Sequence, residues 1–359
     1  MAIVPTHLRG ARSFVAGRFE TVEREVFDDG WTPDDPPTEP IQTQVAIERA
    51  RTIISHNDSP DVGFDSSINP YRGCEHGCIY CYARPSHAYL ELSPGLDFET
   101  RLYAKTNAAE LLREELGKPG YKPSPIALGA NTDCYQPIER KYKITRQILE
   151  VLAECEHPVT LVTKSALVER DVDILAPMAE KNLVRVFLSI GTLDRDLARK
   201  LEPRAASPQR RLDVLKTLSK NAIPCGVMVA ALVPALNDKT MEHVLEAAAA
   251  AGATEAAYVV MRLPHELKPL FKEWLATHYP ERAEHVMSIV RQMRGGREND
   301  PSFGTRMSGT GMFAELIEKR FEIACRRHGL NGHGAPRQRA ELDCSRFRRP
   351  SQGGQIPLF

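Results

Sequence analysis

The sequence has no excess of charge of either sign, because 47 lysines and arginines balance 47 aspartates and glutamates over 359 residues. A protein that binds nucleic acid or a membrane through its overall charge is therefore not indicated, and any such bias must be local. The chain also lacks an apolar run of the roughly 18 residues that a membrane-spanning helix needs, and its first residues lack the apolar stretch of a secretory leader. We therefore expect a cytoplasmic protein with no membrane partner.

Paired zinc half-sites and a disulfide framework are also missing, since the eight cysteines are scattered and no second Cys-x2-Cys or His-x3-5-His pair occurs. What is present is one run of three cysteines, Cys74, Cys78 and Cys81, with glycines beside them. Most iron–sulfur clusters have four cysteine ligands, so a triplet leaves one iron open to an outside ligand. The spacing favours a cluster on these three residues; a structural zinc site completed by His76 or a distant cysteine is the alternative.

Charge is uneven along the chain. Residues 20–40 are acidic and rich in proline, with too little apolar surface to fold alone. From Arg320 onward arginines predominate, which is typical of a solvated surface or of a phosphate-binding patch.

Short apolar runs rich in β-branched residues alternate with amphipathic stretches over the middle of the chain, which predicts a parallel sheet. We expect strands at 67–71, 126–129, 159–163, 184–190, 226–230 and 257–260, and helices at 145–155, 172–181, 208–220 and 239–251. Six such units suit a partial (β/α)6 barrel, although a doubly wound sheet shows the same alternation. Three later helices, at 266–277, 281–293 and 312–328, are expected to close the open side.

A family resemblance follows from the cysteine run. Cys-x3-Cys-x2-Cys with Tyr80 before the third cysteine resembles the signature of radical S-adenosylmethionine (SAM) enzymes. The resemblance implies a [4Fe–4S] cluster that chelates SAM, reductive cleavage to a 5′-deoxyadenosyl radical, and an electron donor such as a flavodoxin or ferredoxin. It also implies an α/β fold, a TIM-like partial (β/α)6 barrel with the cluster in the loop after the first strand.

Within that group, residues 68–234 resemble the spore photoproduct lyase-like proteins, often labelled DNA repair photolyases, and a divergent bacterial branch of them. Tyr80 and Tyr82 flank Cys81 as tyrosines do in the lyases, and they are candidate catalytic residues. Lys164 matches a lysine that pairs with the SAM carboxylate, and Ser189 matches a serine that contacts SAM or is structural. Thr132 and Asp133 end the second strand, where such enzymes bind the SAM amino group; a helix cap is the alternative for Asp133.

One position departs from the lyase pattern. Ala130 occupies approximately the place of the hydrogen-donating cysteine of the lyases. Cys134 is then either a displaced donor or a small buried thiol. Arg204 and Arg211 could reach a substrate phosphate or hold Glu202 and Asp213 in surface ion pairs.

The chain ends in Gln355, Ile356, Pro357, Leu358 and Phe359. This run resembles the pentapeptide by which bacterial polymerases and repair proteins dock on the replicative sliding clamp. The alternative is that Leu358 and Phe359 fold back onto the body.

We expect an N-terminal extension (1–62, partly irregular), a core barrel (63–262), a helical region (263–330) and a flexible basic tail (331–359). The expected function is a radical SAM enzyme that acts on DNA to repair a damaged base. Modification of RNA or protein is one alternative, and a non-catalytic iron–sulfur or zinc adaptor is the other.

Overall fold

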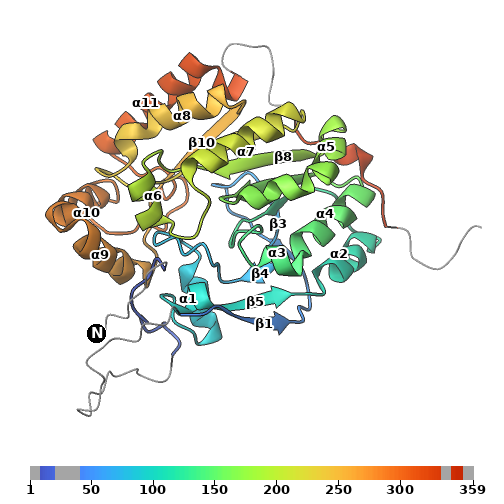
Figure 1. Cartoon of the computed structure of the whole chain (residues 1–359), viewed down its shortest axis with the longest axis horizontal. Helices are drawn as coiled ribbons and strands as arrows, with labels where there is room; N and C mark the ends of the chain where they lie inside the picture. Colours follow the sequence, from blue (N-terminus) through green and yellow to red (C-terminus); the bar gives the residue numbers. More distant parts are fainter. Residues whose placement is uncertain (1–8, 21–40, 333–340, 351–359) are drawn as a thin grey trace, which may run out of the picture.

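The computed structural model describes residues 9–20, 41–332 and 341–350, and its centre is a sheet of seven strands (Figure 1). The order across the sheet is β10-β9-β8-β7-β6-β3-β2. The strands are β2 (Ile54–His56), β3 (Ser66–Ile68), β6 (Ile126–Leu128), β7 (Val159–Thr163), β8 (Val184–Ser189), β9 (Cys225–Leu232) and β10 (Glu255–Val260).

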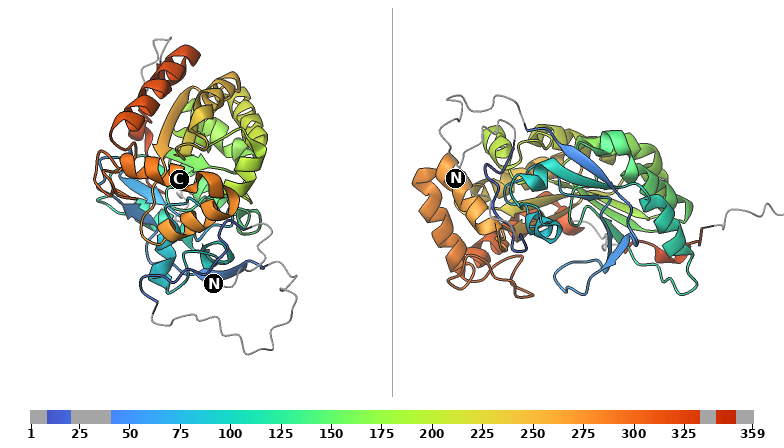
Figure 2. Two further views of the ribbon diagram at one scale, coloured as in Figure 1. Left: turned by 90° about the vertical axis from the view of Figure 1, so that its left-hand side faces the viewer. Right: turned by 90° about the horizontal axis from the view of Figure 1, so that it is seen from below.

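Six of these strands, from β3 to β10, are parallel and lie in the order in which the chain makes them, while β2 pairs antiparallel at one edge. A doubly wound sheet reverses its strand order at a switch point, so this order identifies the fold as a partial (β/α)6 barrel, as expected. The crossover helices lie on the outer face of the curved sheet (Figures 1 and 2). They include α4 (Ile144–Glu154), α5 (Val172–Glu180), α7 (Pro208–Lys220) and α8 (Met241–Ala250).

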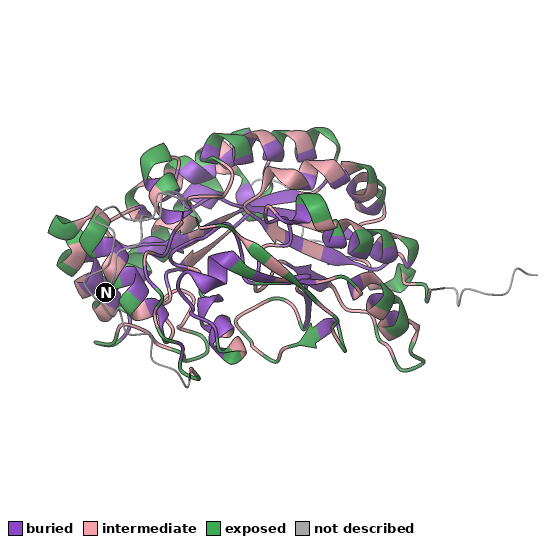
Figure 3. Cartoon of the chain, turned by 60° about the horizontal axis from the view of Figure 1, so that its bottom comes forward, coloured by how far each residue is buried: buried purple, intermediate pink, exposed green. Residues whose placement is uncertain are grey.

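The strands are covered on both faces, which explains their nearly continuous apolar sequence. In β8, five of six residues are buried, and Figure 3 shows the strands as buried and the outward sides of the helices as exposed. Local signals set the helix boundaries: Ser207 caps α7 by accepting from Arg210 N, with Pro208 in the first turn. Asp194 caps α6 (Arg195–Leu201) in the same way.

A second, three-stranded sheet lies beside the barrel and was not expected from the sequence. Its order is β1 (Gln44–Glu48), β5 (Arg101–Lys105), β4 (Tyr71–Arg72), with β1 and β5 parallel and β4 antiparallel. The short α1 (Asp97–Thr100) precedes β5, and α2 (Ala108–Gly117) follows it. Part of the expected N-terminal extension is therefore regular structure that supports the cysteine run.

Residues 9–20, here called the N-terminal strap, pass over the cysteine run. The backbone N–H groups of Gly10 and Ala11 donate to the carboxylate of Glu99, at 2.9 and 2.8 Å. A Cβ at Gly10 would lie 1.7 Å from the carbonyl oxygen of Gly77, so this close contact requires glycine. Further along, Ser13 donates to Glu273 at 2.6 Å, which fixes the strap to the C-terminal region.

The three expected C-terminal helices are present as α9 (Leu267–His278), α10 (Ala283–Gln292) and α11 (Met312–His328). Trp274 of α9 donates from Nε1 to Lys200 O of α6 at 3.0 Å. In contrast, α11 lies along α8 in the outer helical layer (Figure 1), where Arg320 forms an ion pair with Glu242 at 2.6 Å. The expectation that all three helices close the open side is therefore wrong for α11.

The tail is less free than expected over the part that the structure describes. Phe347 contacts the rings of Tyr121 and His157, with centroids 5.5 and 5.4 Å away, and Arg348 N donates to Cys155 O at 2.8 Å. Residues 341–350 are thus held on the body. The clamp-like run Gln355–Phe359 lies outside the described residues.

Candidate active site

The three cysteines lie in one loop, residues 73–82, here called the cysteine loop, directly after β3 and β4. Gly73 and Gly77 have φ values of 71° and 67°, in the left-handed region that favours glycine. A Cβ at Gly77 would lie 2.6 Å from Glu99 Oε2, so the loop also approaches α1 too closely for another residue. The glycines in the run are therefore required by the shape of the loop.

The thiols fit an iron–sulfur cluster. Cys74 and Cys78 are buried, and Cys81 is partly buried and packs against the two hydrophobic clusters that contain Cys78 and Cys74. Burial raises the pKa of the Cys74 and Cys78 thiols, and nearby Asp133 raises that of Cys74 further. Thiolates in such a place need bound cations to stay deprotonated, which iron supplies. In the part of the chain that is described, no three ligating side chains gather closely enough for one metal ion. A cubane cluster needs no such convergence, because each cysteine binds a different iron.

Arg84 clamps the cysteine loop from beneath. Its guanidinium is completely buried and donates to the carbonyl oxygens of Gly77 and Cys78, at 3.1 and 2.9 Å. It also donates to Gly95 O at 2.9 Å and forms an ion pair with Glu99, the residue that holds the N-terminal strap. With Pro94 O as a further acceptor, all five guanidinium N–H groups have partners.

Glu75, inside the cysteine loop, is a second anchor. Its backbone N–H donates to Gln136 Oε1 at 2.9 Å, and its carboxylate accepts from Arg204 at 2.9 Å. Thr43 also donates to this carboxylate. Arg204, considered earlier as a phosphate contact, is thus engaged with the loop that holds the cysteines.

Asp133 ties β6 to β7 and to the cysteine loop. Its carboxylate accepts from Thr163 Oγ1 and from the backbone N–H of Lys164, both at 2.7 Å, and from Tyr135 N at 2.9 Å. His76 Nδ1 lies 3.2 Å from Asp133 Oδ2. Burial alone would raise the pKa of Asp133, but His76 and these hydrogen bonds outweigh it and hold the pKa well below its usual value.

Lys164 begins the loop after β7 and points toward the cysteine loop. Its Nζ lies 5.8 Å from the centre of the Tyr80 ring. Burial works to lower the pKa of Lys164, but Cys78, Glu202 and Asp133 outweigh it and raise the pKa. The side chain is therefore a cation among the groups that line this end of the barrel.

Tyr80, Glu202 and Arg211 form a buried network beside Lys164. The Tyr80 hydroxyl donates to Glu202, and Glu202 forms an ion pair with Arg211. Arg211 also donates to Ser189 O at 2.7 Å and to Ala206 O at 2.8 Å. Of the two alternatives for Arg211, the structure favours the ion pair with Glu202, but the pair is buried rather than on the surface.

Thr132 and Ser189 both hold main chain at the carboxyl ends of strands. Thr132 Oγ1 donates to Tyr71 O at 3.0 Å, which fixes the end of β6 to the strand before the cysteine loop. Ser189 Oγ donates to Ala230 O at 3.1 Å, between β8 and β9. The structure thus brings the candidate SAM contacts Thr132, Asp133, Lys164 and Ser189 to the edge of the sheet that carries the cysteines.

Tyr82 and Cys134 lie in different environments. The Tyr82 side chain is half exposed, at 50%, and its hydroxyl donates to Ala130 O at the end of β6. Cys134 has no exposed surface and belongs to the main hydrophobic core, where burial raises the pKa of its thiol. This placement favours the buried-thiol reading of Cys134 over that of a displaced hydrogen donor.

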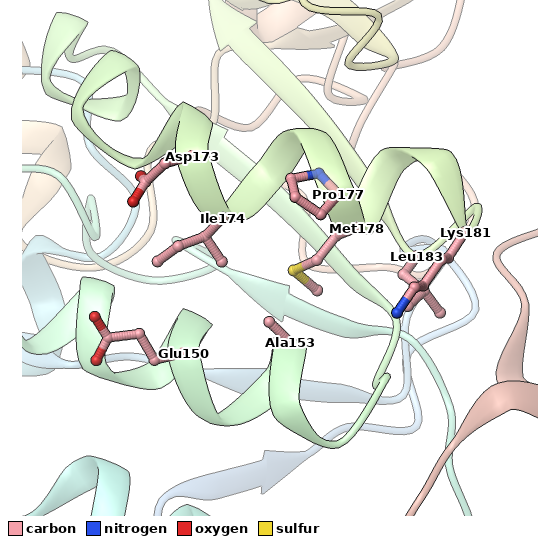
Figure 4. A pocket seen from close by; sticks show the side chains of 8 residues that line it. All are labelled: Glu150, Ala153, Asp173, Ile174, Pro177, Met178, Lys181 and Leu183. Atoms are coloured by element: carbon pink, nitrogen blue, oxygen red, sulfur yellow. The ribbon is translucent and has the colours of Figure 1, made fainter.

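Three residues of the site were missed from the sequence, namely Arg84, Glu99 and Gln136. Each of these residues acts on the site through a partner that lies far from it in the sequence, so no local spacing pattern identifies it. A surface groove between α4 and α5, lined by Glu150, Asp173, Pro177 and Lys181 among others, lies on the outer helical layer (Figure 4). It contains none of the candidate site residues.

Residues 68–248 match the family model described as the radical SAM superfamily. An uncharacterized protein of Mycobacterium tuberculosis is 37% identical over 231 residues, which cover 64% of this chain and 68% of that protein. An uncharacterized protein of Methanocaldococcus jannaschii is 28% identical over 249 residues, or 68% of this chain and 88% of that protein. A protein of Pseudomonas phage M6 named radical SAM Nalpha-GlyT isomerase is 25% identical over 232 residues, or 64% of this chain and 46% of that protein.

Solved structures of spore photoproduct lyase have the same fold. The complex with dinucleoside spore photoproduct superposes with a TM-score of 0.57 at 15% identity, over 80% of each chain. A variant with bound AdoMet and dinucleoside spore photoproduct gives 0.59 at 15% identity, again over 80% of each chain.

Proposed function

The chain belongs to the radical SAM superfamily, and on this premise we propose that it is an enzyme that cleaves SAM reductively and acts on DNA. Enzymes of this family use a [4Fe–4S] cluster and SAM. One observation carries the proposal: the cysteine loop, Asp133 and Lys164 meet at the carboxyl edge of six parallel strands, where catalytic groups of such folds collect.

Cys74, Cys78 and Cys81 would hold the cluster. When bound, the cluster supplies the electron that cleaves SAM to methionine and a 5′-deoxyadenosyl radical. Arg84 and Glu75 orient the loop through backbone contacts, and the N-terminal strap covers it from solvent. The protein thus provides orientation and exclusion of water.

Lys164 is the residue that we assign to the SAM carboxylate. Among the described residues its ammonium has no hydrogen bond or ion pair, although it is partly buried near Cys78. A cation in this state is ready for a compact anionic group. Asp133 already accepts from three donors and lies near His76, so an amino group of SAM would share its carboxylate with them.

A DNA substrate is supported by the resemblance to the photolyase-like proteins and by the fold shared with spore photoproduct lyase. In the lyase complex the bound molecule is a dinucleoside spore photoproduct. Tyr80 and Tyr82 are the tyrosines next to the cluster that we assign to hydrogen transfer, with Cys134 as a candidate donor that would first have to leave the core. Repair of a damaged base is the reaction we favour. There are two alternatives: the enzyme modifies RNA or protein, or the protein is a non-catalytic adaptor.

Two partners complete the proposal. An electron donor such as a flavodoxin or ferredoxin would reduce the cluster in the cytoplasm. None of the helices in the described part of the chain is long and apolar enough to cross a membrane.

The run Gln355–Phe359 would dock on the sliding clamp through Gln355, Ile356, Leu358 and Phe359. A peptide of residues 350–359 that fails to bind the clamp, while a Leu-Phe-bearing control binds, would contradict this role.

The main test is SAM cleavage by anaerobically reconstituted protein with dithionite, with and without irradiated DNA. We expect bound iron and sulfide, formation of 5′-deoxyadenosine, and loss of both in Cys74→Ala, Cys78→Ala and Cys81→Ala. Cys344→Ala is the matched control, because Cys344 lies in the partly exposed tail segment. A colourless, zinc-loaded protein would contradict the proposed radical SAM activity. SAM cleavage that DNA never stimulates would contradict the proposed DNA substrate.

A further inference from the structure

Arg262 lies two residues beyond the end of β10, beside the cysteine loop. Its guanidinium carbon is 5.9 Å from the centre of the Tyr82 ring, and Tyr82 directly follows Cys81. The carboxyl ends of β10 and β6 therefore meet the cysteine loop around this pair, since the Tyr82 hydroxyl donates to Ala130 O. A substrate bound at Tyr82 would therefore lie within reach of Arg262.

Within the described residues, Arg262 has no carboxylate at ion-pair distance, and its buried Nε has no hydrogen-bond partner. Its Nη1 has only the sulfur of Met307, at 3.8 Å. Asp61, the acid whose charge acts on Arg262, is already bound by Arg306 Nε and by the backbone N–H of Gly304. Arg294, behind Arg262, donates to the carbonyl oxygens of Val260 and Met261 at the end of β10. Arg262 is thus a cation with unused donors.

The loop that carries Arg306 adds an exposed aromatic ring. The Arg306 guanidinium carbon lies 4.5 Å from the centre of Phe303, and 58% of the Phe303 side chain is exposed. The loop is fixed to the barrel because Val260 N donates to Met307 O at 2.8 Å. Phe303, Arg306, Arg262 and Tyr82, here called the aromatic–arginine strip, therefore place two guanidinium groups between two half-exposed aromatic residues.

Exposed rings combined with guanidinium groups are what proteins use to bind single-stranded nucleic acids. Rings stack on bases, and arginine donors bind the phosphates between them. The carboxylates of an acidic peptide would pair with Arg262, but they would make no favourable contact with the exposed ring of Phe303. A nucleotide inside a duplex cannot reach a group that lies beside a buried cluster, so the strand must be single or the nucleotide extruded.

We propose that the aromatic–arginine strip binds a single-stranded or extruded segment of nucleic acid, with a phosphodiester on Arg262 and a base on Phe303. This inference rests on the proposed function, since it assigns the substrate path of the same site. It concerns binding, which does not depend on SAM cleavage and can be measured apart from it.

The experiment measures fluorescence anisotropy of a labelled single-stranded oligodeoxynucleotide of about 12 nucleotides with the anaerobically reconstituted enzyme and SAM. We expect Arg262→Ala to weaken binding about tenfold and to reduce the slope of log K against log salt by about 0.7. Phe303→Ala should weaken binding about tenfold while leaving the salt slope unchanged. Because Phe303 is exposed, this variant tests the strip even where Arg262→Ala folds poorly, and Arg262→Lys retains the charge without the planar fork.

The matched control is Arg113→Ala, which removes the same charge from an exposed ion pair on α2. The inference is overturned if the Arg262→Ala and Phe303→Ala variants bind the oligonucleotide as tightly as the Arg113→Ala variant does. Displacement of the oligonucleotide by polyglutamate as efficiently as by unlabelled DNA also overturns it, because the strip would then select charge alone. SAM cleavage by the wild-type enzyme, measured in the same preparation, reports on the proposed function separately: its loss leaves a positive binding result intact.

Discussion

Replacement of Arg84 by alanine tests whether the cysteine loop depends on one buried guanidinium. The side chain joins three segments, because it contacts the cysteine loop, the turn at Gly95 and the carboxylate of Glu99. Alanine removes all five donors, and among the described residues that buried carboxylate then keeps only the backbone N–H groups of Gly10 and Ala11 as donors.

The expected cost follows from the burial of the pair. Arg84 and Glu99 both have no exposed side-chain surface. Removing one partner of such a buried pair destabilises a protein by about 3–5 kcal/mol, because the remaining charge is uncompensated. That is a large part of the roughly 5–15 kcal/mol by which a folded protein is stable. The double variant Arg84→Met, Glu99→Gln should regain part of the loss, since it removes the stranded charge.

The assay is the free energy of unfolding from urea titration, together with iron bound per chain after anaerobic reconstitution. Arg113→Ala provides the comparison, because its ion pair with Glu154 is 44% and 42% exposed and should contribute at most about 1 kcal/mol. The reasoning is refuted if Arg84→Ala lies within about 1 kcal/mol of Arg113→Ala and binds iron as the wild type does.

Three further predictions concern separate parts of the molecule. Gly10→Ala should lower iron binding and stability, since its Cβ would lie 1.7 Å from a carbonyl oxygen of the cysteine loop, whereas Gly120→Ala, with open space around it, should change neither. Burial lowers the pKa of His157 to about 4, so between about pH 4 and 6.5 the unfolded chain binds more protons than the folded one. The free energy of unfolding should therefore rise with pH over this range by up to about 3 kcal/mol. Urea titrations of His157→Gln should show a smaller rise. Lys164→Gln should weaken SAM binding at least about tenfold in equilibrium dialysis of the reconstituted enzyme, because a charge-assisted hydrogen bond is lost. Equal weakening in Lys181→Gln, which removes a half-exposed lysine paired with Glu156, would contradict this role.

The parallel strands could be predicted best where they are almost wholly buried and read as apolar runs, as β6, β8 and β9 do, whereas most residues of β10 are only partly buried. The small sheet could not be predicted, because β1 has a mostly exposed sequence and finds its partner β5 more than 50 residues later. Chain order across the sheet, which separates a barrel from a doubly wound fold, is likewise a matter of pairing between distant strands.

The residues of the site likewise fall into those that the sequence predicts and those that only the fold reveals. Cys74, Cys78 and Cys81 are adjacent in sequence, so their spacing alone indicated a common ligand. Arg84 and Glu99 look like ordinary surface charges until the fold buries them together. A charged residue is expected at the surface by default, and only its partner reveals that it is internal.

The N-terminal strap has a consequence for the order of events during synthesis. Its residues are made before the groups that hold them, because Gly10 needs Glu99 and Ser13 needs Glu273, which is 260 residues later in the chain. The strap therefore cannot be fully closed until most of the chain exists. Until then the strap lacks its contact with Glu273, so the cover of the three-thiol loop is completed only by a segment that is made late in the chain.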